Sequence, residues 1–261
     1  DGHRKMSRPL LIAICILGAS AAMFNTRQVV RKALQANYAG QCAANDQAKT
    51  KSCLDTYFKY YGIDTSKGLP EFAAYANLTN SLVLNYDLAG FDIYCDFEST
   101  LEGCLGSLMT SACMNPDGFT KMYGVNENDA VGYATTFPVE SYTCQNKDLA
   151  KKYFPCMMDM EKSDHLQGLI DCTTVMENEI ESATDPCLPL DHYVTCIETV
   201  YVKFCDKGIQ EFVCNTEELA FNFEMDGKCK DKLHHCSSSS SISFIGVAVL
   251  LLLRILFDGA F

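Results

Sequence analysis

The chain has 261 residues, of which 48% are hydrophobic and 21% charged, and this composition excludes an intrinsically disordered protein. Its net charge of −12 argues against nucleic acid as a partner, because so acidic a surface repels phosphate backbones. Fifteen cysteines exceed what a reduced cytosolic protein carries, and no C-x-x-C pair indicates a metal site, so we expect disulfides and an oxidising compartment.

Residues 6–21 are predicted to be a signal peptide. Arg8 provides a short basic region before the apolar run 10–18, and the small residues 19–21 that follow are typical of a signal-peptidase site. The apolar run is too short to span a bilayer. Cys15 lies in this leader, so an even number of cysteines, fourteen, remains for the exported part.

Apolar residues at helical spacing predict a helix over 24–61 and another after Pro70. The residues expected to share one face of the second helix are Phe72, Tyr75 and Leu78. Asn77 begins the N-glycosylation sequon of this helix. If Asn77 is glycosylated, its helix face points to solvent, because a glycan cannot be buried. An isolated sequon can also remain unused.

One cysteine spacing occurs twice and organises the rest of the chain. Gaps of 8, 8 and 30 residues separate Cys95, Cys104, Cys113 and Cys144, and then again Cys187, Cys196, Cys205 and Cys236. This repetition predicts a duplicated disulfide framework. Two cysteines with eight residues between them lie on opposite faces of a helix, because the chain turns through about 900° from one to the next. We therefore expect each such helix to be tied to neighbours on two sides, or its cysteines to lie in the loops at its ends.

The framework divides the chain into two halves, 22–145 and 146–236, if Cys144 closes the first. The first half then contains Cys42, Cys53, Cys95, Cys104, Cys113 and Cys144, and the second contains Cys156, Cys172, Cys187, Cys196, Cys205, Cys214, Cys229 and Cys236. Both sets are even, so each half can pair its own cysteines, with three bridges in one and four in the other. Sequence alone leaves the pairing within each half open.

Residues 124–141 form the least regular stretch and are predicted to be a polar loop and a hinge between the halves. Asn126 and Asp129 suggest a calcium-binding loop. The positions where an EF-hand needs glycine and glutamate are Val131 and Phe137, however, so this motif is excluded.

The second half has the clearer helical pattern. An amphipathic helix is expected over 157–182, and another from Leu190 through Cys205 with Asp191 capping its start. Three aromatic residues are expected to pack beneath them, namely Phe212, Phe221 and Phe223. Three methionines are interpreted as core filling, with a ligand groove as the alternative: Met157, Met158 and Met160.

Residues 237–261 combine a serine run with a C-terminal apolar tail. The run Ser237–Ser241 precedes the tail 242–257, a pattern typical of a GPI-attachment signal with Ser237, or else Ser238, as the attachment residue. A single transmembrane helix is the alternative, although sixteen apolar residues are few for a span and no basic cluster follows them. A tail with neither role is the third possibility.

Catalytic and metal-binding motifs are missing from the sequence. It has no G-x-S-x-G elbow, no H-E-x-x-H pair and no phosphate-binding glycine loop. Asp191 and His192 come closest to the pair used by disulfide-rich helical lipases, but their order is reversed and the glycine-rich calcium loop is missing. His234 and His235 are adjacent and so point apart, which disfavours a metal site beside Cys236. We expect no cofactor.

The segments 95–105 and 196–205, with Phe212 beyond them, resemble the secreted cysteine-rich family of unknown function that is expanded in nematodes. The resemblance covers residues 42–236. It implies an extracellular, mainly helical, disulfide-linked protein, and it brings no catalytic residues.

The expected fold is therefore all-α, a disulfide-stapled helical bundle of two related halves. The expected place is the extracellular face of the plasma membrane, with secretion as the alternative if the tail is not an anchor. The expected function is non-enzymatic recognition or surface coating through contacts with an extracellular protein or a glycan. The alternative is a carrier or sensor of a small apolar ligand such as a lipid or sterol, since bridged helices can enclose a pocket lined by Met and Phe. A secreted hydrolase is the third possibility.

Overall fold

The computed structural model describes residues 42–85, 89–160, 165–224, 227–233 and 236. The predicted signal peptide, the part of the predicted helix 24–61 that precedes residue 42, and the tail with Ser237 lie outside these ranges. Every regular element within them is a helix, so the predicted all-α class is confirmed.

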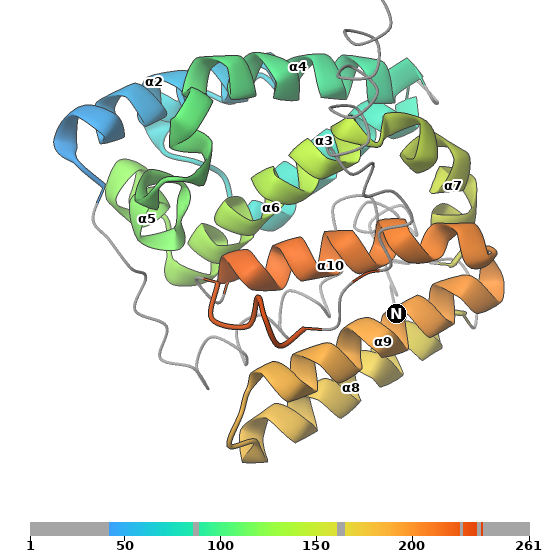
Figure 1. Cartoon of the computed structure of the whole chain (residues 1–261). Helices are drawn as coiled ribbons and strands as arrows, with labels where there is room; N and C mark the ends of the chain where they lie inside the picture. Colours follow the sequence, from blue (N-terminus) through green and yellow to red (C-terminus); the bar gives the residue numbers. More distant parts are fainter. Residues whose placement is uncertain (1–41, 86–88, 161–164, 225–226, 234–235, 237–261) are drawn as a thin grey trace, which may run out of the picture.

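The first half contains five α-helices in the described ranges, joined by three short 3₁₀ turns. In chain order they are α2 (Ala44–Tyr60), η2 (Thr65–Lys67), α3 (Phe72–Asn85), α4 (Ala89–Leu105), η3 (Gly106–Thr110), η4 (Ala112–Met114), α5 (Pro116–Tyr123) and α6 (Glu127–Gln145). Helices α2 and α4 lie side by side, and α6 crosses beneath them (Figure 1).

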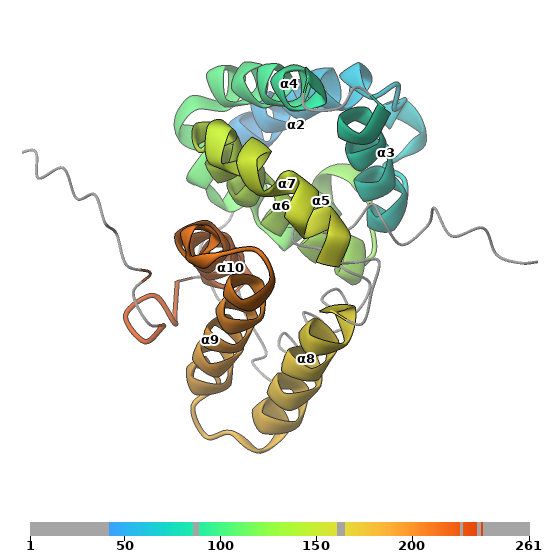
Figure 2. The same cartoon turned by 90° about the vertical axis from the view of Figure 1, so that its right-hand side faces the viewer.

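The second half contributes four α-helices and one 3₁₀ turn to the described chain. These are α7 (Lys147–Met160), α8 (His165–Ser182), α9 (Cys187–Phe204), η5 (Lys207–Ile209) and α10 (Gln210–Glu224). Helices α8 and α9 form a hairpin that projects away from the first half, while α10 lies between α9 and α6 (Figures 1 and 2). In the part of the chain described, no helix has both the length and the apolar character needed to cross a bilayer.

Residues 124–141 correct the prediction of a polar loop and hinge, because most of them belong to the central helix α6. The Asn126 side chain begins the helix by accepting a hydrogen bond from the Asp129 backbone N–H at 2.9 Å. Every residue from 129 to 137 is buried. A helix buried on all sides has no polar face, so it lacks the alternation that predicts a helix from sequence.

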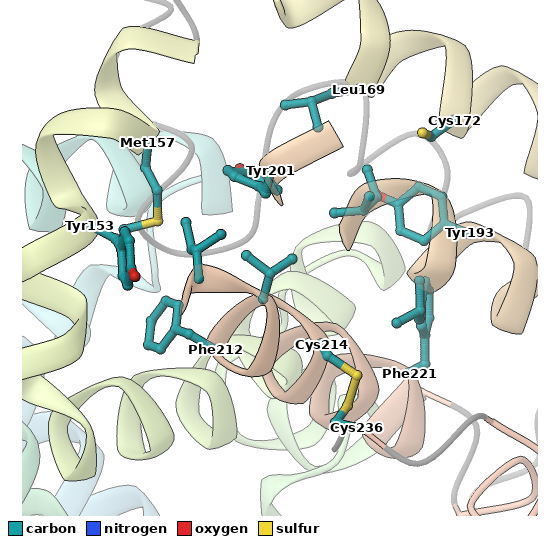
Figure 3. Close-up of a cluster of buried hydrophobic side chains, with 14 of the residues drawn as sticks. Tyr153, Met157, Leu169, Cys172, Tyr193, Tyr201, Phe212, Cys214, Phe221 and Cys236 are labelled. Atoms are coloured by element: carbon teal, nitrogen blue, oxygen red, sulfur yellow. A yellow bond between two sulfur atoms is a disulfide. The ribbon is translucent and has the colours of Figure 1, made fainter. Parts of the chain in front are cut away.

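Two hydrophobic cores fill the molecule. The first lies among α2 to α6 and is built around large aromatic side chains such as Tyr57, Phe58 and Tyr133. The second lies among α7 to α10 (Figure 3), and its buried members include all three methionines predicted as core filling. It also includes Phe91 and Tyr94 of α4, so the packing crosses the boundary between the two halves.

All fourteen cysteines of the described residues form disulfides, and the pairing pattern repeats. The first half contains Cys42–Cys113, Cys53–Cys104 and Cys95–Cys144. The second contains Cys156–Cys205, Cys172–Cys196, Cys187–Cys229 and Cys214–Cys236. Three bridges of each half thus correspond. The expected equivalence of Cys144 and Cys236 is wrong, because Cys229 takes that place and Cys236 closes an additional bridge.

The predicted geometry of the cysteine-bearing helix is confirmed in α4. Cys95 bonds to α6 and Cys104 to α2, so the two cysteines tie α4 to different neighbours. Cys187 and Cys196 do the same for α9.

Two local predictions need correction. Leu78 of α3 is 41% exposed, because the buried stripe of this helix passes through Ala76 and Thr79 instead. Helix α9 begins at Cys187 after the N-cap residue Pro186, so Asp191 lies inside the helix and does not cap its start. The Cys187 backbone N–H donates to the Asp185 carboxylate at 3.1 Å.

Candidate functional site

An open hollow of about 950 Å³ lies along α2 and the turn that follows it. Its lining residues are Ala48, Lys51, Ser52, Asp55, Thr56, Lys59, Gly62, Ile63, Asp64 and Thr65. The members on α2 recur every three or four positions, so they form one stripe of the helix. The other side of the helix carries Leu54, Tyr57 and Phe58, which are buried in the first core.

Asp55 is the most fully bonded residue of the hollow. Its carboxylate accepts hydrogen bonds from Lys51 Nζ at 2.8 Å and from the Tyr123 hydroxyl of α5 at 2.9 Å. Partial burial raises the pKa of Asp55, but hydrogen bonds from Lys51, Thr65 and Tyr123 outweigh burial and hold it below its ordinary value. Asp55 therefore remains ionised and fixes the orientation of its neighbours.

A tight turn forms the far wall of the hollow. Gly62 has a φ of 73°, a left-handed conformation that favours glycine, and the chain reverses there. The Asp64 side chain then accepts a hydrogen bond from the Ser66 backbone N–H at 3.2 Å and caps η2. This turn brings Thr65 within hydrogen-bonding distance of Asp55.

The lining is polar and carries both charges. Two lysines and two aspartates accompany hydroxyl groups, and neither a histidine nor a cysteine is among the lining residues. Tyr60, one position beyond Lys59, is 43% exposed and stacks on Phe97 with ring centroids 4.7 Å apart. The hollow itself offers hydrogen-bond donors and acceptors and both signs of charge.

One group of potential metal ligands occurs in the described residues, in the second half. Ligand atoms of Glu198, Cys214 and Cys236 lie within 4.8 Å of one another. The two sulfur atoms are joined in a disulfide (Figure 3), so neither can act as a thiolate ligand. The chemistry of this donor set does not fit a metal.

His192 contacts Glu179 of α8 at 2.9 Å, and its side chain is exposed. His192 is thus a surface residue of α9. Asn77 is half-buried in the middle of α3, while the Thr79 hydroxyl is buried and donates to the Ala76 carbonyl at 3.0 Å. Glycosylation of Asn77 stays a prediction, and Ser237 lies outside the described residues.

Sequence reasoning missed both the hollow on α2 and a buried pair of acids, Glu98 and Glu140. Glu98 gives a signal in the sequence, because it falls on the apolar stripe of Tyr94, Leu101 and Leu105 at helical spacing. A carboxyl on such a stripe is unexpected and indicates a special environment.

Neither a family model, nor a curated protein, nor a solved structure matches this chain. The geometry of the molecule is therefore the basis for assigning a function.

Proposed function

We propose that the protein is an exported, non-enzymatic recognition module that contacts an extracellular protein or a glycan through the hollow on α2. The observation that supports it is the hollow itself, which is open and lined by charged and hydroxyl side chains. The seven disulfides indicate an extracellular or secreted protein.

The polarity of the hollow favours a polar partner. Sites for small apolar ligands are lined mainly by hydrophobic side chains with a few polar groups, whereas seven of the ten residues that line this hollow carry a charge or a hydroxyl. A sugar presents hydroxyl groups that can bond to the Lys and Asp side chains of the hollow. A polar peptide loop can use the same groups.

The scaffold beneath the hollow is held by covalent bonds. Cys53 joins α2 to α4, and Cys42 joins the start of α2 to η4. Such cross-links reduce the conformational entropy lost on binding, because the contact surface is already ordered in the free protein. This pre-organisation suits a surface that must recognise its partner in the extracellular environment.

The proposal includes a membrane tether through residues 237–261, with a GPI anchor at Ser237. Phosphatidylinositol-specific phospholipase C should release the protein from intact cells if this anchor is present. Persistence on the cell surface after treatment would favour a transmembrane tail. Membership of the secreted nematode-expanded cysteine-rich family belongs to the same proposal.

A pair of matched substitutions tests the contact surface. Thr56 in the hollow and Thr174 on α8 are both exposed, and each hydroxyl donates to the carbonyl oxygen four residues earlier. Thr56→Arg should abolish binding of the fluorescently labelled protein to its native cells or to a glycan array, because the long side chain occupies the hollow. Thr174→Arg should bind like the unmodified protein. Equal binding by both variants would contradict the proposal.

The alternative, a carrier of a small apolar ligand, has the second core as its candidate location, where Met157, Tyr153 and Phe212 converge (Figure 3). Native mass spectrometry of the protein secreted from eukaryotic cells distinguishes the two functions. The recognition module should show the mass of the chain with seven bridges and no lipid-sized adduct. A copurified lipid or sterol would instead favour the carrier function over the recognition function.

A further inference from the structure

Two glutamates from different helices are completely buried in the first core. Glu98 of α4 and Glu140 of α6 are both 0% exposed. No lysine, arginine or histidine is buried anywhere in the described part of the chain. The pair therefore lies in an aromatic core without a buried cation beside it, an environment in which an ionised carboxylate is costly.

Hydroxyl groups surround Glu140. Its carboxyl oxygens accept hydrogen bonds from Tyr57 of α2 at 3.0 Å and from Tyr75 of α3 at 3.3 Å, and Thr136 lies at 3.5 Å. The two tyrosine hydroxyls also lie 3.2 Å from each other. Glu140 is thus the acceptor on which these hydroxyls converge, and it can hold a negative charge better than its neighbour can.

Glu98 differs, because neither of its oxygens makes a hydrogen bond of ordinary geometry in the described structure. Glu140 is nevertheless close enough to interact with it. Two ionised carboxylates can only accept, so they cannot bond to each other. A proton on Glu98 turns it into a donor toward Glu140 and satisfies both groups.

The electrostatics act in the same direction. Burial, followed by the charges of Glu140 and Glu102, raises the pKa of Glu98 well above its ordinary value. Burial also raises the pKa of Glu140, to about 7, although hydrogen bonds from Tyr57 and Tyr75 oppose it. The titratable and hydroxyl groups that face the pair are Tyr57 of α2, Tyr61 directly after that helix, Tyr75 of α3, Tyr94 and Glu102 of α4, and Thr136 of α6.

We propose that Glu98 and Glu140 form a buried proton-binding site, which keeps the first core closed below neutral pH and loosens it when both carboxyls ionise. Four helices, α2, α3, α4 and α6, supply the groups of this site, so its charge state acts on the whole first half. The inference is independent of the recognition function proposed for the hollow.

The sign of the effect follows from linkage. The folded-state pKa of each acid lies above its unfolded value, so the folded state binds more protons than the unfolded state does. The resulting stabilisation is complete below the unfolded pKa of about 4.3 and is lost as the pH rises through 7 and above. The protein should therefore melt at a higher temperature at pH 5.5 than at pH 8, by about 5–10 °C.

Thermal denaturation of the full secreted chain tests the site, with Glu98→Gln as the informative variant. Glutamine has the shape of a protonated glutamate and keeps a donor toward Glu140, but it cannot ionise. Glu98→Gln should raise the Tm at pH 8 and remove most of the difference between the two pH values. Glu181→Gln, an exposed position on α8, is the control and should keep the full difference.

Hydrogen exchange locates the effect. After correction for the intrinsic pH dependence of exchange, the amides of α4 and α6 should lose protection at pH 8 while those of α9 keep theirs. Glu98→Leu is a second variant in case Glu98→Gln is not secreted, and it should also remove the pH dependence.

Three outcomes would overturn the proposal. The first is an unmodified protein whose Tm is the same at pH 5.5 and pH 8. The second is a Glu98→Gln or Glu98→Leu variant that retains the full difference. The third is a fall in the Tm of the unmodified protein at pH 8 on addition of EDTA that Glu98→Gln abolishes, because the pair would then hold a metal cation in place of a proton.

Discussion

Glu98 in the first half and Leu190 in the second occupy equivalent places in the cysteine framework. Glu98 lies six positions before Cys104, which joins α4 to α2. Leu190 lies six positions before Cys196, which joins α9 to α8. Both side chains are 0% exposed. The same position of the same bridged helix thus holds a carboxyl in one core and an aliphatic side chain in the other.

This difference separates what the fold requires from what the first half adds. An aliphatic side chain of similar size fills the position in the second half, so the framework needs a buried side chain there but not an acid. The carboxyl of Glu98 is costly to bury. Its presence, together with Glu140 and the surrounding hydroxyls, is a property of the first core alone.

The largest effect should come from placing the acid in the wrong half. Leu190→Glu puts a carboxyl in place of a completely buried aliphatic side chain, away from Glu140 and its hydrogen-bonding hydroxyls, and an uncompensated buried charge costs about 3–5 kcal/mol. We expect little secreted protein, with any that folds melting far below the unmodified chain at pH 7.

Leu188→Glu is the control for this experiment, because Leu188 lies two positions earlier on α9 and is 55% exposed. It should be secreted and should melt normally. If Leu190→Glu is secreted and melts like Leu188→Glu, the second core accepts a buried carboxyl at this position as the first core does.

Removing one corresponding bridge from each half should have the next largest effect. The double substitutions Cys53→Ala with Cys104→Ala, and Cys172→Ala with Cys196→Ala, should each cost about 2–5 kcal/mol. The first bridge closes 51 residues and the second 24, so the first loss should be larger by about 0.5–1 kcal/mol. Denaturant titration without reductant measures both, and the reverse order would show that native-state contacts dominate over loop length.

Tyr57→Phe should have the smallest effect, and its size should depend on pH. The substitution removes the hydroxyl that donates to Glu140, and a hydrogen bond to a charged group is worth about 1.5–3 kcal/mol. The loss should be close to this range at pH 8, where Glu140 is ionised, and smaller at pH 5.5. Tyr60→Phe, at an exposed position three residues further along α2, should change the Tm little at either pH. If Tyr57→Phe loses the same stability at both pH values, the Tyr57 hydroxyl does not stabilise the charge of Glu140.

Sequence reasoning predicts the parts of this fold that have a periodic signal. Helix α2 alternates Leu54, Tyr57 and Phe58 with polar residues, and the structure confirms it from Ala44 to Tyr60. The repeated cysteine spacing predicted a duplicated framework, and three pairs of corresponding bridges agree with it. The exact pairing could not be predicted, because it depends on which helices lie side by side.

Features that depend on tertiary contacts could not be predicted either, because the sequence does not show which helices lie side by side. Helix α6 is buried from residue 129 to 137, so its sequence shows no polar face and looks irregular. Glu98 and Glu140 lie 42 positions apart in the chain, and although Glu98 falls on an apolar stripe, nothing in the sequence links it to Glu140. Only the packing of α4 against α6 brings the two carboxyls together.

The closure of each half by its own bridges has a consequence for synthesis. The first three disulfides need nothing beyond Cys144, so they can all form while the ribosome is still adding the second half. Phe91 and Tyr94, however, pack into the core that α7 to α10 complete later. The nascent first half can therefore have all its disulfides while part of its apolar surface is still exposed. During this interval it has the greatest need of chaperones.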